Sequence, residues 1–197
     1  EHNLPNTIDS IIKQEIPLEY EVIIASPDEE AKILTTRLNK TYRIKYFKDP
    51  GIGKSNAINL LLKELKGDIL VFTDGDVILG DDSIKEITNS FLDLRNGCVA
   101  GRVVSSNRKD NMFGYWSHLL ADAGAHRIRS KLSKQNKFLE CSGYLFAFRN
   151  NIIKNIPLDV AEDSIIPYYF WKRGYKVKYA KNAKIYVKNP NNFDEWF

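Results

Sequence analysis

The pattern of hydrophobic and polar positions predicts a chain that alternates between strands and helices over its first half. Short apolar runs of strand length are separated by stretches in which apolar residues recur every three to four positions, as in amphipathic helices. The runs of strand length cover residues 21–25, 43–47, 68–73 and 99–105, and the helical patterns cover 4–14, 27–39, 54–66 and 81–94. The run from Ile69 to Phe72 is apolar without alternation, which is typical of a strand buried on both faces. The alternation predicts an α/β fold with an open, mostly parallel sheet and helices on both faces.

After residue 105 the alternation weakens and the pattern becomes mixed. The helical patterns of this half lie at about 110–132 and 162–173, and strand patterns lie at 144–148, 175–179 and 184–187. A chain of 197 residues with 43% hydrophobic residues has the length of one domain and can bury a sizeable core. We therefore expect one continuous domain with a division near residue 97.

Composition and charge exclude several classes of protein. No run approaches the roughly 18 apolar residues of a membrane span, residues 1–14 do not resemble a signal peptide, and two cysteines make no disulfide framework. The sequence thus favours an intracellular, soluble domain. The net charge of +4 is mild, but the second half is rich in lysine and arginine. Such a half could face phosphates or an anionic membrane, or be an ordinary solvated surface. Because the basic residues are dispersed and no recognition motif appears, we expect no nucleic-acid partner.

Two carboxylates follow the buried strand directly, in Asp74-Gly75-Asp76. Ligands of open α/β sheets bind beyond the carboxyl ends of the strands, where this motif lies. Two carboxylates ~4 Å apart repel by ~4 kcal/mol at an effective dielectric of ~20, so the pair is poorly placed without a cation. Hard cations such as Mg²⁺ or Mn²⁺ accept one or two carboxylates together with substrate phosphates and water. The motif predicts such a site, although a plain turn after a strand uses the same residue types.

A second acidic pair, Glu162 and Asp163, opens a predicted helix. Acidic residues at a helix start often only complement the helix dipole. The transfer of a group to a hydroxyl, however, needs one base to accept the proton of that hydroxyl, and a carboxylate near a metal–diphosphate site meets that need.

In order and spacing, the motifs resemble the GT-A domain of family-2 glycosyltransferases, over nearly the whole chain. The residues that carry the resemblance are Gly53-Lys54-Ser55-Asn56-Ala57-Ile58-Asn59, Gly67-Asp68, Phe72-Thr73-Asp74-Gly75-Asp76, Ser142-Gly143 with Arg149, Glu162-Asp163-Ser164, Arg173-Gly174-Tyr175-Lys176-Val177 and Ala183. The resemblance implies inverting transfer of a sugar from a nucleotide diphosphate sugar to an acceptor hydroxyl. It further implies a nucleotide-sugar-binding half at residues 1–97 and an acceptor-binding half at 98–197.

The resemblance also implies roles for individual residues. Asp74 is expected on the ribose or diphosphate side of the donor, and Asp76 as ligand of Mn²⁺ or Mg²⁺, with Asp74 beside it. Asp163 is expected to be the general base, and Glu162 is its neighbour and second candidate. The other expected contacts are Asp28 and Lys54 for the nucleotide, and Cys141, Ser142 and Gly143 for the acceptor sugar.

Two departures from the family pattern concern the ends. The family's first strand is missing, and Glu1 looks like the last residue of that stretch. Residues 189–197 resemble the lead-in to a Gln-Arg-Arg-Trp type motif of membrane synthases. We therefore expect a piece of a longer enzyme held at the cytoplasmic face of a membrane, with a UDP- or GDP-sugar as donor and a saccharide or lipid-linked acceptor.

Three alternatives remain. A P-loop NTPase shares Gly53-Lys54-Ser55, but its pattern needs a glycine where Lys48 stands. A sugar-nucleotide nucleotidyltransferase also uses carboxylates and a metal, but it opens with a Gly-rich, Arg-containing loop that this chain lacks. The third alternative is a catalytically silent binding module on the same fold.

Overall fold

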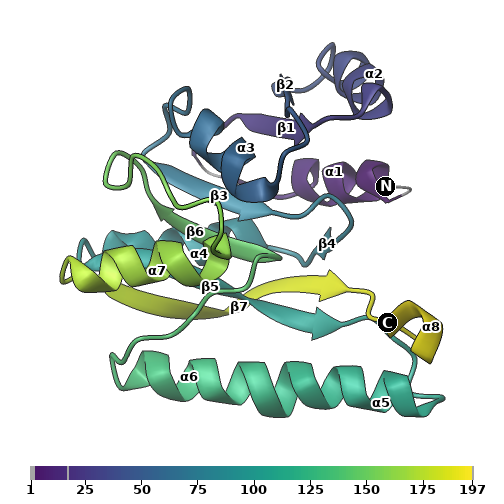
Figure 1. Ribbon diagram of the computed structural model, residues 1–197, viewed down its shortest axis with the longest axis vertical. Coiled ribbons are helices and arrows are strands. Elements are labelled where there is room, and N and C mark those ends of the chain that lie inside the picture. The colour runs from purple at the N-terminus through teal and green to yellow at the C-terminus, as the bar shows by residue number, and fades with distance from the viewer. Residues whose placement is uncertain (1–2, 17, 197) are drawn as a thin grey trace.

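Two separate sheets form the framework of the computed structural model, which describes residues 3–16 and 18–196 (Figure 1). The strands are β1 (Val22–Ser26), β2 (Ile44–Lys48), β3 (Ile69–Thr73), β4 (Ile78–Leu79), β5 (Asn96–Ser105), β6 (Leu145–Arg149) and β7 (Lys176–Val187). The helices are α1 (Leu4–Ile12), α2 (Glu29–Leu38), α3 (Lys54–Leu61), α4 (Ser83–Asn89), α5 (Met112–Leu119), α6 (Arg127–Lys134), α7 (Glu162–Lys172) and α8 (Phe193–Trp196), with a 3₁₀ turn η1 (Ser90–Leu92) and a π-helix η2 (Leu120–His126). The expected elements of the first half are therefore present, with shifted ends.

The larger sheet has the order β3-β6-β5-β7-β4, and its strand directions correct the expectation of a mostly parallel sheet. Only β5 and β7 run parallel, whereas β3–β6, β5–β6 and β4–β7 are antiparallel pairs. An apolar run that is buried on both faces shows burial but not direction, so the sequence pattern could not distinguish the two arrangements. The expected strands at 175–179 and 184–187 are one strand, β7, whose pairing with β5 is interrupted between Ala100 and Arg102.

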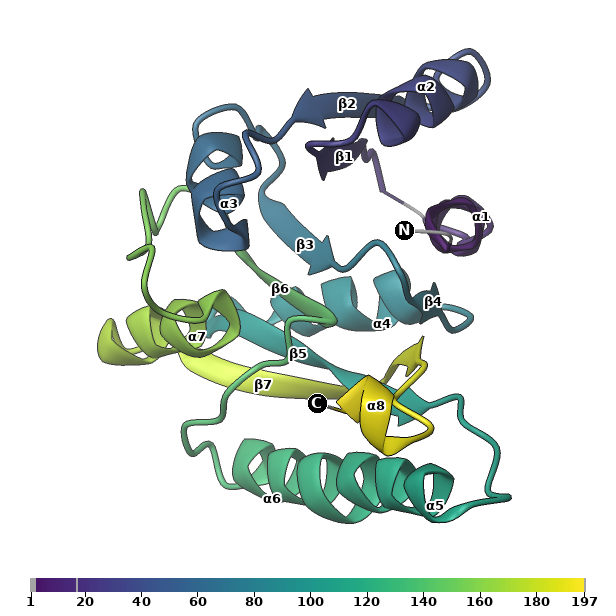
Figure 2. The ribbon, with the colours of Figure 1, turned by 45° about the vertical axis from the view of Figure 1, so that its right-hand side comes forward.

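Helices cover both faces of this sheet, as predicted, and each face has its own core (Figure 2). On one face, Phe146 and Phe148 of β6 pack with Phe170 of α7 and with Ile58 of α3. On the other face, α4 and the strands bury a second cluster that includes Ile87. The central strands are thus enclosed, which explains their unbroken apolar runs.

The smaller sheet pairs β1 with β2 in parallel, and α1 joins it to the larger sheet. Ile8 of α1 packs against Ile24 and Ile44 of the small sheet. On its other side, α1 donates hydrogen bonds to the segment that leads into β4, for example from Thr7 Oγ1 to the Val77 carbonyl at 2.6 Å. Glu1 and Phe197, on which the two expectations about the chain ends rest, lie outside the described residues. Within residues 3–16 and 18–196, no helix is long and apolar enough to cross a membrane.

Candidate active site

The end of β3 and the start of β6 lie side by side because these strands are antiparallel neighbours. Thr73, the last residue of β3, is paired with Leu145, the first residue of β6. The Thr73 hydroxyl also donates to the Tyr144 carbonyl at 2.8 Å. Asp74 and the loop that contains Gly143 therefore meet at one edge of the sheet, although they are far apart in sequence. The predicted donor and acceptor motifs are brought together by this pairing.

Lys54 connects the two acidic motifs. It lies in the first turn of α3, directly after Gly53, whose φ of +108° is readily adopted only by glycine. The Lys54 ammonium is 2.6 Å from Asp74 Oδ1 and 2.8 Å from Glu162 Oε1. Burial lowers the pKa of Lys54, but its hydrogen bonds to the two carboxylates outweigh that effect and hold the pKa above its usual value. One cation thus offsets two negative charges.

Glu162 and Asp163 open α7, as predicted, but their side chains have different surroundings. Glu162 is nearly buried and is engaged by Lys54. Asp163 is partly exposed, and its Oδ2 accepts a 2.9 Å hydrogen bond from the Gly143 amide. No described residue is hydrogen-bonded to Asp163 Oδ1. Of the two acidic side chains, Asp163 is therefore the more exposed, and its Oδ1 is open to a substrate.

Asp76 lies on the exposed side of the turn after β3. Asn3 of α1 donates to its carbonyl at 3.1 Å, and Thr7 donates to the Gly75 carbonyl at 3.0 Å. Burial raises the pKa of the Tyr144 hydroxyl, and the negative charges of Asp74 and Asp76 raise it further. Both carboxylates thus act on the same side chain. The roles of Asn3, Thr7 and Tyr144 were not predicted, because no sequence pattern links them to the Asp-Gly-Asp motif.

The residues at this edge fit a hard divalent cation that shares its coordination with a substrate. Among the described residues, no group of three or more histidine, cysteine or acidic side chains is arranged to hold a metal by itself. Asp76 is exposed, and Asp74 gives one oxygen to Lys54 and keeps the other. Magnesium-type sites that also use substrate phosphates need only one or two carboxylates. Asp74 and Asp76 meet that requirement.

The three residues expected at the acceptor differ in their burial and in their distance from the acidic side chains. Gly143 lies at the centre of the site, since an added Cβ would be 3.2 Å from both Glu162 Oε1 and Lys54 Nζ. Ser142 is almost fully buried next to it. Cys141 is also buried, with its Sγ 3.5 Å from Cys98 Sγ. Its amide and carbonyl are bonded to Asp163 and Arg129, so the Cys141 thiol faces the core and not the site.

Asp28 lies apart from this cluster, at the junction of β1 and α2. It is the residue before α2, and its amide donates to the Ser26 hydroxyl at 3.1 Å. Ser26 is the last residue of β1. The loop before Lys54 lies against the same junction, since a Cβ on Gly51 would be 3.5 Å from Pro27. Among the residues that the structure describes, no hydrogen bond or ion pair joins Asp28 to Lys54.

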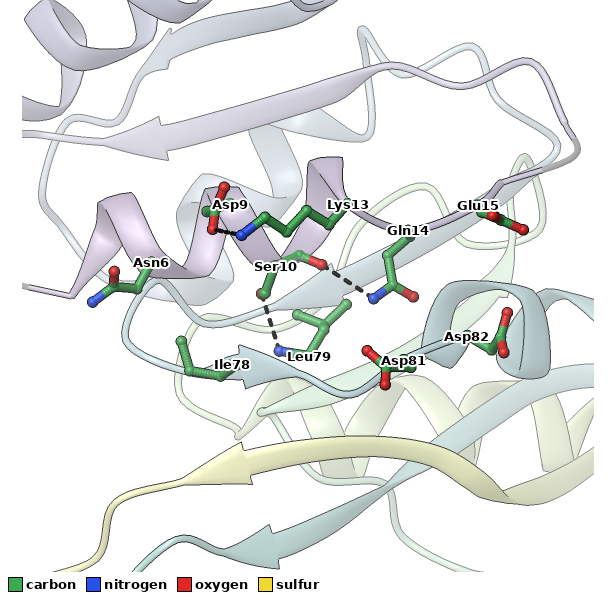
Figure 3. Close-up of a pocket in the computed structure, with 10 residues that line it drawn as sticks. All are labelled: Asn6, Asp9, Ser10, Lys13, Gln14, Glu15, Ile78, Leu79, Asp81 and Asp82. Carbon is green, nitrogen blue, oxygen red and sulfur yellow. Dashed lines mark hydrogen bonds and ion pairs between the residues drawn. The ribbon is translucent and has the colours of Figure 1, made fainter.

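A pocket of about 630 Å³ lies between α1 and β4 (Figure 3). Its lining is polar and includes Ser10 and Gln14 of α1, together with Asp81 and Asp82. Ser10 accepts a hydrogen bond from the Leu79 amide at 3.1 Å. None of the predicted site residues lines it, so the cavity is separate from the carboxylate cluster.

The fold is that of GT-A glycosyltransferases, with a mixed sheet, helices on both faces and acidic residues at one strand end. Solved structures of that class match it. A mannosyltransferase from Pyrobaculum calidifontis, solved with GDP-Man and Mn²⁺, matches with a TM-score of 0.75 at 19% identity, over 97% of this chain and 54% of that chain. TarS of S. aureus in complex with UDP-GlcNAc matches with a TM-score of 0.67 at 16% identity, over 98% of this chain and 56% of that one. At such identities the likeness concerns the fold.

Sequence comparison identifies the family. Residues 1–156 match glycosyl transferase family 2, and the chain belongs to this family. A curated relative, glycosyltransferase GlyA of Streptococcus pneumoniae serotype 4, is 24% identical over 136 residues, which cover 68% of this chain and 19% of the relative. The chain thus spans about a fifth of the length of that relative.

Proposed function

We propose that this domain transfers a sugar from a nucleotide diphosphate sugar to an acceptor hydroxyl, with inversion at the anomeric carbon. The observation that carries the proposal is the meeting of Asp74, Lys54, Glu162 and Asp163 at one edge of the sheet. These residues come from three segments of the chain and match the family's motifs in order. The solved relatives bound to GDP-Man and UDP-GlcNAc support a nucleotide-sugar donor, with UDP or GDP as the first candidates.

In the proposed reaction, Asp163 accepts the proton of the acceptor hydroxyl while that oxygen bonds to the anomeric carbon. The bond from this carbon to the diphosphate oxygen breaks in the same displacement, and the diphosphate leaves with the bonding electron pair. The Gly143 amide holds Asp163 Oδ2, which orients the free Oδ1 and keeps the carboxylate ready as a base. A single base without a nucleophilic partner carboxylate is suited to inversion.

On the donor side, Asp74 and Asp76 would hold Mn²⁺ or Mg²⁺, which would offset the charge that develops on the leaving diphosphate. Lys54 supplies a fixed positive charge next to Asp74 and is within reach of the same region. We assign residues 1–97 to the donor and 98–197 to a saccharide or lipid-linked acceptor, with Asp28 near the nucleobase and Ser142-Gly143 near the acceptor. The acceptor of the whole protein would belong to one of these two classes.

Calorimetry with UDP and GDP, each with Mn²⁺ or with EDTA, tests the donor side. We expect binding with Mn²⁺ that is lost in EDTA and in Asp76→Asn, whereas Asp163→Asn keeps it. Equal affinity with EDTA would contradict the metal role. Release of nucleoside diphosphate from a nucleotide sugar should accompany turnover. Consumption of a nucleoside triphosphate with release of pyrophosphate would instead identify a nucleotidyltransferase.

A further inference from the structure

The helical segment 112–134 turns small side chains toward the sheet. It consists of α5, η2 and α6 in direct succession, and it forms a long rod along one side of the molecule (Figures 1 and 2). The buried residues of this rod are Gly114, Ser117, Ala121 and Ser133. Gly114 comes so close to the preceding loop that an added Cβ would lie 1.9 Å from the Arg108 carbonyl oxygen. The fully buried positions of the rod are thus small, and Leu132 is a larger side chain that is partly buried against the core.

Six large apolar residues of the rod lie on its outer side. We call this set the outer apolar stripe, and it comprises Met112, Tyr115, Trp116, Leu119, Leu120 and Ile128. These side chains are 42–60% exposed, and most are spaced by three or four positions, which places them along one side of a helix. A surface helix normally has the opposite arrangement, with large apolar residues toward the core. Contiguous apolar surface of this kind marks a site of contact with a protein or a membrane.

The rod becomes basic where the stripe ends. Arg127, Lys131 and Lys134 are exposed on α6, and their side chains form no ion pair or hydrogen bond within residues 3–16 and 18–196. We call these three residues the basic end. The acidic residue in the middle of the rod, Asp122, is already paired with Arg102 at 3.1 Å. The outer face therefore combines an apolar, aromatic part with an unneutralised positive part.

We propose that this outer face docks on an anionic lipid surface. The leucine and aromatic side chains of the stripe enter the boundary between headgroups and acyl chains, and the basic end contacts lipid phosphates. Trp116 and Tyr115 have the amphipathic rings that are enriched at that depth. The proposal is independent of the sugar-transfer chemistry, since none of its residues belongs to the carboxylate cluster.

Charge complementarity favours lipid over a second copy of the chain. If two rods paired antiparallel, the basic end of each would extend toward the apolar stripe of the other. If they paired in parallel, the two basic ends would face each other and repel. An anionic membrane satisfies both parts of the face at once, because it offers apolar chains beneath negative phosphates.

The test is flotation of the 197-residue chain with vesicles of phosphatidylcholine, with or without ~30% phosphatidylglycerol. We expect binding to the anionic vesicles that weakens at high salt, because the Debye length falls from ~30 Å at 0.01 M to ~10 Å at 0.1 M ionic strength. Leu119→Ser/Leu120→Ser should lower the partition coefficient at least ~10-fold, since two apolar side chains no longer enter the interface. Lys131→Gln/Lys134→Gln should lower it about 25-fold, at about fivefold per charge.

Matched variants separate the surface from general effects. Leu92→Ser/Leu94→Ser removes two leucines that are more exposed than those of the stripe but lie outside the rod. Lys63→Gln/Lys66→Gln removes two exposed charges near the end of α3. Both control variants should bind as the unchanged chain does, and all four variants should melt at the same temperature.

Two results would overturn the proposal. The first is the absence of binding to anionic vesicles at low salt, and the second is an equal loss in the stripe and control variants. Sedimentation provides a further check on the identity of the partner. A dimer that Leu119→Ser/Leu120→Ser dissociates, without any lipid binding, would assign the stripe to self-association instead.

Discussion

Replacement of Asp163 by asparagine tests the proposed base while it leaves the local structure in place. Asp163 Oδ2 accepts the Gly143 amide at 2.9 Å, and an asparagine carbonyl oxygen can accept the same hydrogen bond. The substitution therefore removes the proton acceptor without releasing the loop. General-base catalysis typically contributes ~10²–10⁴-fold, which corresponds to about 3–5 kcal/mol of transition-state stabilisation. We expect the turnover of sugar transfer to fall by that factor.

Two neighbouring variants distinguish the base from its support. Asp163→Ala removes the acceptor of the Gly143 amide as well, so it should lose a further ~0.5–1.5 kcal/mol of stability that Asp163→Asn keeps. Glu162→Gln removes one of the two charges that face Lys54, but Lys54 retains Asp74 and a glutamine oxygen can still accept its hydrogen bond. We therefore expect Glu162→Gln to lower turnover less than about tenfold, because Lys54 stays in place between the two side chains.

The transfer assay needs a donor. A thermal-shift panel of nucleoside diphosphates with Mn²⁺ can identify the nucleotide, because a ligand at ~100 times its dissociation constant stabilises the folded chain by ~2.7 kcal/mol. Single-turnover transfer then measures chemistry, and calorimetry measures donor affinity, which should be nearly unchanged in Asp163→Asn. If Glu162→Gln abolishes transfer and Asp163→Asn does not, the base is Glu162. If neither variant matters, the acidic pair only caps α7.

Three further predictions concern stability and reactivity. Lys54→Met should lower the free energy of unfolding by about 1–2 kcal/mol, a value discounted because the lysine is 41% exposed. Since the pKa of Lys54 is raised in the folded chain, this contribution is present below pH ~10 and is lost as the pH rises through that pKa. Urea unfolding at increasing alkaline pH should therefore show the difference between the variant and the unchanged chain vanish. Gly114→Ala should lower the free energy of unfolding by about 1–3 kcal/mol, because the added Cβ meets the Arg108 carbonyl. Gly124→Ala has open space around the added Cβ and should raise the free energy of unfolding by up to ~1 kcal/mol. Thermal melts measure both changes. Burial raises the pKa of the Cys98 thiol, so iodoacetamide at pH 8 should leave Cys98 unmodified until urea unfolds the chain; rapid modification in buffer alone would contradict that packing.

The sequence located the elements of the site because their signals are local. An unbroken apolar strand followed by Asp74-Gly75-Asp76, and an acidic pair at the start of a helical pattern, are both visible within a dozen residues. The structure places Lys54 between them, and its role as a site residue stays a prediction. Its contact with Glu162 could not be predicted, because the partners are separated by more than a hundred residues and no pattern encodes such a pairing.

Strand direction and the contacts of supporting residues depend on segments that are far apart in the sequence. For strand direction the sequence-based prediction was wrong, and for the supporting contacts there was none. The expected parallel sheet is mixed, since direction depends on how the 110–140 segment returns the chain to β6. The carbonyl contacts of Asn3 and Thr7 with residues 75–77 were missed for the same reason. Cys141 carries a family motif position, yet its thiol packs on Cys98, which only the packing of the loop onto β5 determines.

Lys54 explains how acidic side chains can gather at this edge of the sheet before any other cation is involved. Two carboxylates ~4 Å apart repel by ~4 kcal/mol at an effective dielectric of ~20, and the Lys54 ammonium lies within 2.8 Å of both Asp74 and Glu162. A divalent cation held by Asp74 and Asp76 would compete with Lys54 for Asp74 but not for Glu162. In the proposed reaction, Lys54 would then remain anchored to α7 through Glu162 while its other hydrogens turn to the diphosphate. In this proposal Glu162 would anchor Lys54, and Asp163 would meet the acceptor.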